Sequence, residues 1–420
     1  MQSPHSYGAA AIKRVRPRWE LADVLHLHGE AFLRSHPQPL HHLKIMRAIS
    51  ACRTPVLGGH VVCCGNCGFQ KQAYNSCRNR HCPKCQSLVK AKWLEARTAE
   101  LLPVGYFHVV FTLPHALNPI ILCNKALMLK FLFDATAKTL GQFARDPKRG
   151  LGGKLGFIAV LHSWDQKLMD HFHIHCLIPA GVLSKDGQRW IHARTDFLFP
   201  VKALAQVFRG KYIALLKNAF IKQQLIFPGR TASSGTSAGF SEVIAQLYQK
   251  NWVVYCKPPF GGPRKVLDYL ARYTHRVAIS NHRIKAINDH GVTFSYRDRR
   301  DGDKTKVMTV APHEFIRRFL LHAIPTSFMR IRHFGFLANR SKKHDLQLCR
   351  ELLGLPIPLP DTPPISNQER LRELTCRVPP TQTPLRPTYL DPGSAPSARS
   401  YYSLFLISSI FGPRIRPFNL

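Results

Sequence analysis

Seven of the twelve cysteines of this chain lie between Cys52 and Cys85, and this clustering constrains the fold more than any other feature. Cys64 and Cys67 form one C-x2-C pair, and Cys82 and Cys85 form a second. Each pair can place two thiolates on a tight turn, and four thiolates suit the tetrahedral geometry of zinc. Because four cysteines leave no open position for a substrate, we predict a structural zinc ion in this segment.

Other residues of the same segment can also bind zinc, either as a second site or in place of members of the first. The spacing therefore leaves open whether the segment binds one ion or two. The N-terminal residues show no basic region followed by an apolar one, so we expect a protein of the reducing cytoplasm rather than a disulfide scaffold. The additional candidate ligands are Cys52, His60, Cys77 and His81.

The balance of charge points to a polyanionic partner. The chain has 60 lysines and arginines against 24 acidic residues, which gives a formal net charge of +36. Such a surface favours nucleic acid over an anionic membrane, and no run approaches the ~18 apolar residues of a membrane-spanning helix. Cations are frequent in and after the cysteine-rich segment, where they can contact DNA phosphates. The predicted contacts are Arg78, Arg80, Lys84 and Lys90.

The period of the hydrophobic residues changes along the chain. Helical spacing is found over 18–50, 88–102, 118–145 and 202–224, and β-rich segments cover 106–113, 156–164, 172–179, 252–256 and 292–296. From residue 103 onward, this order resembles a β-α-β-β-α-β alternation. We therefore predict an α+β fold, with a small N-terminal zinc-binding domain and a second domain built on a central antiparallel sheet flanked by helices. The composition of 228–240 predicts a loop.

Three histidines alternate along one predicted strand. His171, His173 and His175 have a period of two, so their side chains project from the same face of the strand. Imidazoles in this arrangement can bind one divalent ion and leave metal positions open, which suits a Lewis acid acting on a phosphoryl oxygen. We predict a catalytic Mg²⁺ or Mn²⁺ ion here, although imidazole favours transition metals. Further possible ligands are His162 and Gln166, and weaker candidates are His108 and His115.

Two tyrosines lie four residues apart in a predicted helix. Tyr269 and Tyr273 share one helical face, and Arg272 and Arg276 lie among and after them. Alone, such a pair indicates packing. In a strongly basic chain with a histidine strand, the phenols are candidate nucleophiles toward phosphorus, and the arginines are candidate phosphate contacts. The chain has no GxxxxGK[ST] phosphate loop, so we expect no use of ATP.

Three separated motifs together resemble one family. They are the segment NSCRNRHCPKC (75–85), the strand HFHIHCLIP (171–179) and the run YLARYTHRVAISNHRI (269–284). In this order they resemble the two-tyrosine rolling-circle transposases of bacterial insertion sequences, which are HUH (His-hydrophobe-His) endonucleases. The resemblance extends from about residue 18 to about residue 353.

The resemblance implies a fold and a set of roles. Residues 1–102 would form a helical and zinc-binding DNA-binding domain, and 103–353 the catalytic domain with a replication-initiator type of sheet. His173 and His175 match the HUH pair, and His171 lies in register with them. Tyr269 and Tyr273 match the nucleophiles. The Pro-rich residues 354–420 are expected to be a disordered tail.

The family also implies a mechanism. One tyrosine attacks a phosphodiester of single-stranded DNA, retains the 5′-phosphate and frees a 3′-OH, and the second tyrosine acts at the other end or at the target. The expected location is the bacterial cytoplasm, at the nucleoid. Two alternatives stay open: a plasmid replication initiator or relaxase with the same chemistry, and a decayed transposase that binds DNA through its zinc domain without cutting it. The oligomeric state is not predicted.

Overall fold

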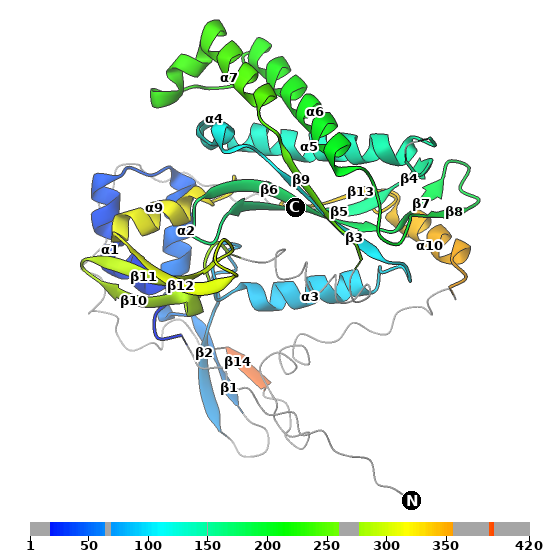
Figure 1. The fold of residues 1–420 in the computed structure, drawn as a ribbon. Helices are drawn as coiled ribbons and strands as arrows, with labels where there is room; N and C mark the ends of the chain where they lie inside the picture. Colours follow the sequence, from blue (N-terminus) through cyan, green and yellow to red (C-terminus); the bar gives the residue numbers. More distant parts are fainter. Residues whose placement is uncertain (1–16, 64–68, 149, 260–276, 356–385, 390–420) are drawn as a thin grey trace, which may run out of the picture. The chain divides into compact units, whose positions relative to one another are not determined.

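A computed structural model describes residues 17–63, 69–148, 150–259, 277–355 and 386–389 (Figure 1). The chain divides into two compact units, of which one comprises 1–52 with 77–377 and the other 53–76 with 378–420. The predicted domain boundary near residue 102 stays a prediction. Each unit is described by itself.

The larger unit is built around one five-stranded antiparallel sheet. Its strand order is β13-β5-β6-β3-β9, so strands that are distant in sequence lie side by side (Figure 1). The four strands predicted in this part of the sheet are present, whereas β13 was not expected from the sequence. This sheet confirms the predicted α+β class. The strands are β3 (Tyr106–Thr112), β5 (Gly156–Trp164), β6 (Asp170–Pro179), β9 (Val253–Lys257) and β13 (Ile331–Gly335).

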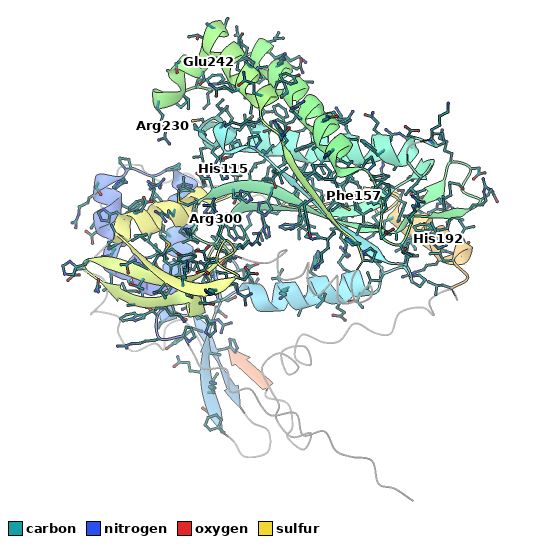
Figure 2. The ribbon with its side chains drawn as sticks, in the orientation of Figure 1. His115, Phe157, His192, Arg230, Glu242 and Arg300 are labelled. Carbon is teal, nitrogen blue, oxygen red and sulfur yellow. The ribbon has the colours of Figure 1, made fainter. Side chains whose placement is uncertain are left out.

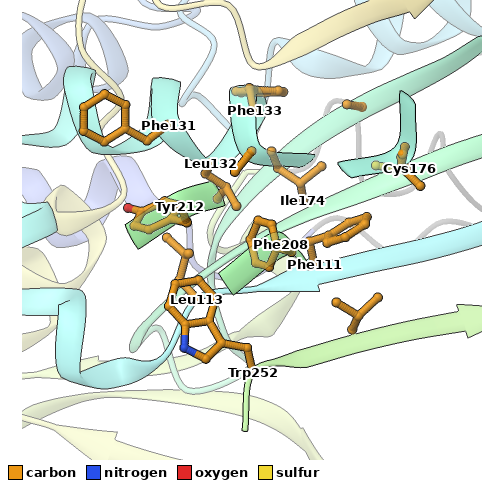
Figure 3. Close-up of a cluster of buried hydrophobic side chains, with 14 of the residues drawn as sticks. Phe111, Leu113, Phe131, Leu132, Phe133, Ile174, Cys176, Phe208, Tyr212 and Trp252 are labelled. Atoms are coloured by element: carbon orange, nitrogen blue, oxygen red, sulfur yellow. The ribbon is translucent and has the colours of Figure 1, made fainter. Parts of the chain in front are cut away.

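One face of this sheet is apolar and covered by helices. Long helices α5 (Lys125–Arg145) and α6 (Val201–Ile221) pack on it, as the alternating strand pattern requires. Figure 3 shows Phe111 and Ile174 of the sheet near Phe208 of α6. These side chains are fully buried, so the face is sealed from water and the histidines of β6 are left to the opposite face.

The opposite face is covered only over part of its area by apolar side chains. Val160 and Leu177 of the sheet belong to a separate buried cluster, against which side chains of α3 (Gln86–Thr98) and α10 (Lys342–Leu352) pack. Toward the β5–β6 turn this face carries histidines in place of aliphatic residues. Along the same strands, aliphatic side chains of the core are thus replaced by the polar side chains of a candidate site.

A second core joins the N-terminal helices to a small sheet. Helices α1 (Leu21–Ser35), α2 (Leu40–Ser50) and α9 (Pro312–Leu321) share buried side chains with the three-stranded sheet β10-β11-β12. Asn281 accepts a hydrogen bond from the backbone N–H of Leu21 at 3.1 Å, which ties the start of α1 to this core. The strands are β10 (Ile284–Asn288), β11 (Gly291–Asp298) and β12 (Lys304–Val310).

The prediction of a loop over 228–240 was wrong. The segment begins with the 3-10 helix η3 (Gly229–Gly235), and α7 (Ser237–Gln249) starts directly after it. Thr236 caps this helix, since its hydroxyl accepts from the backbone N–H of Gly239 at 3.1 Å. Small polar residues here form a helix start, which has the same composition as a loop.

Shorter elements complete the larger unit. They are the helices η2 (His115–Leu117), α4 (Asn118–Cys123) and η4 (Asn281–Arg283), and a small antiparallel sheet of β4 (Gly153–Lys154), β7 (Gly181–Ser184) and β8 (Trp190–His192).

The smaller unit contains a three-stranded antiparallel sheet of its own, of order β14-β1-β2. It includes β1 (Gly59–Cys63), β2 (Gln70–Tyr74), β14 (Arg386–Tyr389) and the short helix η1 (Pro55–Leu57). Gly58 links η1 to β1 with a φ of +68°, a conformation that favours glycine. Within the expected disordered tail, residues 386–389 form a strand. Among the described residues, no helix is long and apolar enough to cross a membrane.

The packing of the central sheet gives a first test. Phe111 is fully buried and its ring lies 5.0 Å from that of Phe208. We expect Phe111→Ala to lower the free energy of unfolding by about 3–5 kcal/mol, because it leaves a cavity between sheet and helix. The matched control, Val307→Ala, truncates a side chain that is 63% exposed, and should change stability by less than about 0.5 kcal/mol. Urea titration followed by tryptophan fluorescence measures both, and equal losses would contradict the assignment of this core.

Candidate metal centres

Three buried histidines converge on the polar face of the sheet. His162 on β5 and His173 on β6 are directly paired across the strands, and His175 follows two residues later on the same face. One ring nitrogen of each lies within 4.8 Å of the other two, and the Nε2 atoms of His173 and His175 are 3.1 Å apart. Three nitrogens that close together form a set of ligands for one ion.

Hydrogen bonds on the far side of the rings orient this set. The Nδ1–H of His173 donates to the carbonyl oxygen of His171 at 2.8 Å, and Nδ1 of His175 lies 2.8 Å from Nε2 of His108. A carbonyl can only accept, so the neutral ring of His173 has its proton on Nδ1 and a lone pair on Nε2. The lone pair therefore points toward the other two histidines.

Burial keeps these rings neutral. Loss of hydration lowers the pKa of His173 and of His175 well below its ordinary value, and the neighbouring His162 lowers both further. A metal ion requires the neutral form of imidazole, so ligands of this kind need not lose protons before they bind. The donor set of three imidazole nitrogens fits a divalent ion and leaves coordination positions free.

The third member of the set differs from the one that the sequence favoured. We predicted His171 beside His173 and His175, but the structure brings His162 into the group. The β5–β6 ladder has an irregularity between the pairs His162–His173 and Trp164–Asp170, so two residues of β6 face one residue of β5. The ring of His171 lies 4.7 Å from that of His173 and 5.4 Å from that of His115, nearer to the strand end.

A cation that the sequence analysis did not single out lies near the histidines. The positive charge of Arg299 contributes to lowering the pKa values of His171, His173 and His175. Arg299 is exposed on the turn between β11 and β12, where Figure 2 labels its neighbour Arg300. The turn between β5 and β6 is fixed to β11 by Lys167, whose Nζ lies 5.0 Å from the ring centre of Tyr296. Nothing in the sequence indicates this proximity, because it depends on packing between two sheets.

A second cluster contains four cysteines. The Sγ atoms of Cys52, Cys77, Cys82 and Cys85 all lie within 4.8 Å of one another, and Cys52 and Cys82 are fully buried. The sulfurs of Cys52 and Cys85 are 3.4 Å apart and those of Cys77 and Cys85 are 3.6 Å apart. A tetrahedron of thiolates at the usual Zn–S distance of ~2.3 Å has sulfur separations of ~3.8 Å. The arrangement therefore fits a zinc ion.

Three chain segments meet at this cluster. Cys52 follows α2, and Cys77 follows residues 53–76, which belong to the smaller unit. Cys85 is the N-terminal cap of α3. Cys82 and Cys85 lie on one turn, in which the N–H of Cys85 donates to the carbonyl of Cys82 at 3.3 Å. Hydrogen bonds from the Cys77 and Cys82 thiols hold the pKa of Cys85 well below its ordinary value. A thiolate is the form that zinc binds.

The quartet combines one predicted pair with two of the alternative ligands. Cys82 and Cys85 belonged to the first predicted set, and Cys52 and Cys77 to the possible replacements. Cys64 and Cys67 lie outside the described residues, as do Tyr269, Tyr273, Arg272 and Arg276. His60 lies on β1 in the smaller unit, and His81 is buried beside the cluster without joining it.

The cations around this cluster are in part engaged within the protein. The guanidinium of Arg80 donates to the carbonyls of Phe328 at 2.7 Å and Pro325 at 2.8 Å. Lys84 forms an ion pair with Glu20 and donates to the carbonyl of Cys52 at 3.4 Å. These contacts hold the cysteine turn to the rest of the unit. Arg78 is exposed and Lys90 half-buried, and their contact with DNA stays a prediction.

Comparison with known proteins supplies the family. A family described as "Transposase zinc-binding domain" matches residues 24–113, and one described as "Putative transposase" matches residues 156–345. "Putative transposase y4qJ" of Sinorhizobium fredii is 48% identical over 361 residues, which cover 85% of this chain and 90% of that protein. The chain belongs to this family of transposases. The "Transposase for insertion sequence element IS801" of Pseudomonas savastanoi pv. phaseolicola is 30% identical over 74% of this chain and 73% of its own length.

The matched regions coincide with the two clusters of the transposase. The four-cysteine cluster lies inside the zinc-binding match, and the three histidines lie inside the transposase match. This confirms the predicted family and its N-terminal zinc-binding domain. No solved structure matches the transposase.

The assignment of the zinc ligands can be tested by metal analysis. We expect Cys52→Ser with Cys77→Ser to lose one zinc ion per chain relative to the unchanged protein, because two ligands of the described quartet are removed. Cys64→Ser with Cys67→Ser should keep that ion, and so should Cys123→Ser, which alters a cysteine outside the cluster. Mass spectrometry of the purified proteins counts the zinc. Loss of the ion only from the Cys64 and Cys67 variant would contradict the assignment.

Proposed function

We propose that this transposase cleaves and joins single-stranded DNA by metal-assisted attack of a tyrosine on a phosphodiester. The observation that carries the proposal is the convergence of three buried imidazoles from β5 and β6. Such a site has open positions for phosphate oxygens, unlike the closed shell of four cysteines. His162, His173 and His175 would hold one divalent ion, Mg²⁺ or Mn²⁺, which supplies Lewis acidity at a phosphoryl oxygen when bound.

Tyr269 and Tyr273 are the proposed nucleophiles. The phenolic oxygen of one forms a bond to phosphorus, and the bond from phosphorus to the 3′ oxygen of the preceding nucleotide breaks. The leaving oxygen takes up a proton and becomes a free 3′-OH, while the 5′-phosphate stays on the tyrosine. Because the ester conserves the energy of the phosphodiester, the reaction requires no ATP. The second tyrosine permits a second cleavage. A free 3′-OH can then attack the phosphorus of a phosphotyrosine, which releases the tyrosine and joins the two DNA strands.

Charge supports single-stranded DNA as the partner. The net charge of +36 favours a polyanion, and Arg299 adds a cation near the histidines, where a phosphate would bind. Arg78, Lys90, Arg272 and Arg276 are the proposed contacts with the DNA backbone. Both relatives are transposases of bacteria, which supports action at the bacterial nucleoid.

Covalent trapping tests the nucleophiles. We expect the transposase to form a covalent adduct with a labelled single strand from an end of its own element in Mn²⁺, and Tyr269→Phe with Tyr273→Phe to abolish it. Tyr255→Phe is the matched control, since Tyr255 is an exposed tyrosine on β9 of the same domain. Denaturing gels measure the adduct. An adduct that survives the double substitution would contradict the proposed nucleophiles, and binding without any adduct would favour a transposase that has lost cleavage.

The identity of the third metal ligand gives a separate test. We expect His162→Ala to slow cleavage by about 100-fold or more, because it removes a ligand of the Lewis acid. His171→Ala should cost less, since its ring lies outside the converging group. Initial rates of cleavage are measured under saturating Mn²⁺, with DNA binding followed by fluorescence anisotropy as a control. A larger loss with His171→Ala than with His162→Ala would return the role to the residue that the sequence favoured.

A further inference from the structure

A fourth histidine contacts the triad from behind. His108 lies on β3, which is the neighbour of β6 on the side away from β5. Its Nε2 is 2.8 Å from Nδ1 of His175, and both rings are buried. The ring centres are 5.0 Å apart with planes 7° from parallel. Two parallel rings can have centres this far apart at such a short N–N distance only if they lie nearly end to end. The hydrogen bond therefore lies close to the plane of both rings. This is the direction in which an imidazole lone pair points.

We propose that His108 is a positioning residue that accepts the Nδ1–H of His175 and thereby leaves Nε2 of His175 free to bind the metal ion. The inference rests on the metal site proposed above and goes beyond the three ligands. A neutral imidazole has one donor and one acceptor nitrogen. With the proton on Nδ1, the lone pair of His175 points at Nε2 of His173, 3.1 Å away. With the opposite tautomer, an N–H would point into the site and block binding.

The two ligands from β6 are thus held by different acceptors. For His173 the acceptor is the backbone carbonyl of His171, on the same strand. Because this group belongs to the backbone, no side-chain substitution removes it. For His175 the acceptor is a side chain from another strand. Acceptors in this position usually set both the tautomer and the basicity of a ligand, and their loss costs 10–100-fold in metal affinity.

Two amides of different reach can separate positioning from packing. In His108→Gln the amide can occupy the position of Nε2 and accept the hydrogen bond, whereas in His108→Asn it ends one methylene short. We expect His108→Asn to bind Mn²⁺ about 10–100-fold more weakly than the unchanged protein, and His108→Gln to recover most of this affinity. His333→Gln is the matched control on β13 of the same sheet, since His333 contacts Arg97 at 3.2 Å.

The measurement uses the full-length, zinc-loaded protein and Mn²⁺ alone, with free Mn²⁺ determined by electron paramagnetic resonance. Circular dichroism and zinc content confirm that each variant is folded. Equal Mn²⁺ affinity for folded His108→Asn and His108→Gln would overturn the role of His108 and leave the metal site intact. If His173→Ala with His175→Ala does not change Mn²⁺ binding, the metal site itself fails. The two failures are therefore distinguishable without any activity assay.

Discussion

Burial of three imidazoles at the open end of an antiparallel strand pair is the constraint on which the site depends. Ring nitrogens of His162, His173 and His175 are held close together in a buried region, where loss of hydration lowers the pKa values of His173 and His175. In the proposed site, one metal ion would be bound by all three nitrogens together. The apolar face beneath, sealed by α5 and α6, fixes the strands that hold them.

The zinc cluster serves a different purpose from the histidine group. Its four sulfurs join the end of α2, the turn at Cys82 and the start of α3, and they leave no position for a substrate. Arg80 connects the same turn to the carbonyls before β13, a strand of the five-stranded sheet. The cysteine cluster therefore fits a structural role, and the histidine cluster is the site for which we propose chemistry on phosphate.

The sequence predicted what depends on local pattern and not what depends on pairing between distant segments. The period of two was enough to place His173 and His175 together, and the α+β class followed from the order of helices and strands. The exchange of His171 for His162 depends on an irregularity in the β5–β6 ladder, and the choice of Cys52 and Cys77 depends on which segments meet. The hydrogen bond between His175 and His108 and the proximity of Arg299 have no signal in any short segment. Tyr269 and Tyr273 lie outside the described residues, so their assignment rests on the motif.

Anomalous diffraction from crystals of the zinc-loaded protein soaked in Mn²⁺ tests the central claim most directly. Data collected on either side of the manganese edge locate that metal, and data at the zinc edge locate the other. We predict a manganese peak within bonding distance of His162, His173 and His175, and a zinc peak among Cys52, Cys77, Cys82 and Cys85. A manganese peak elsewhere, with the three histidines unligated, would contradict the account.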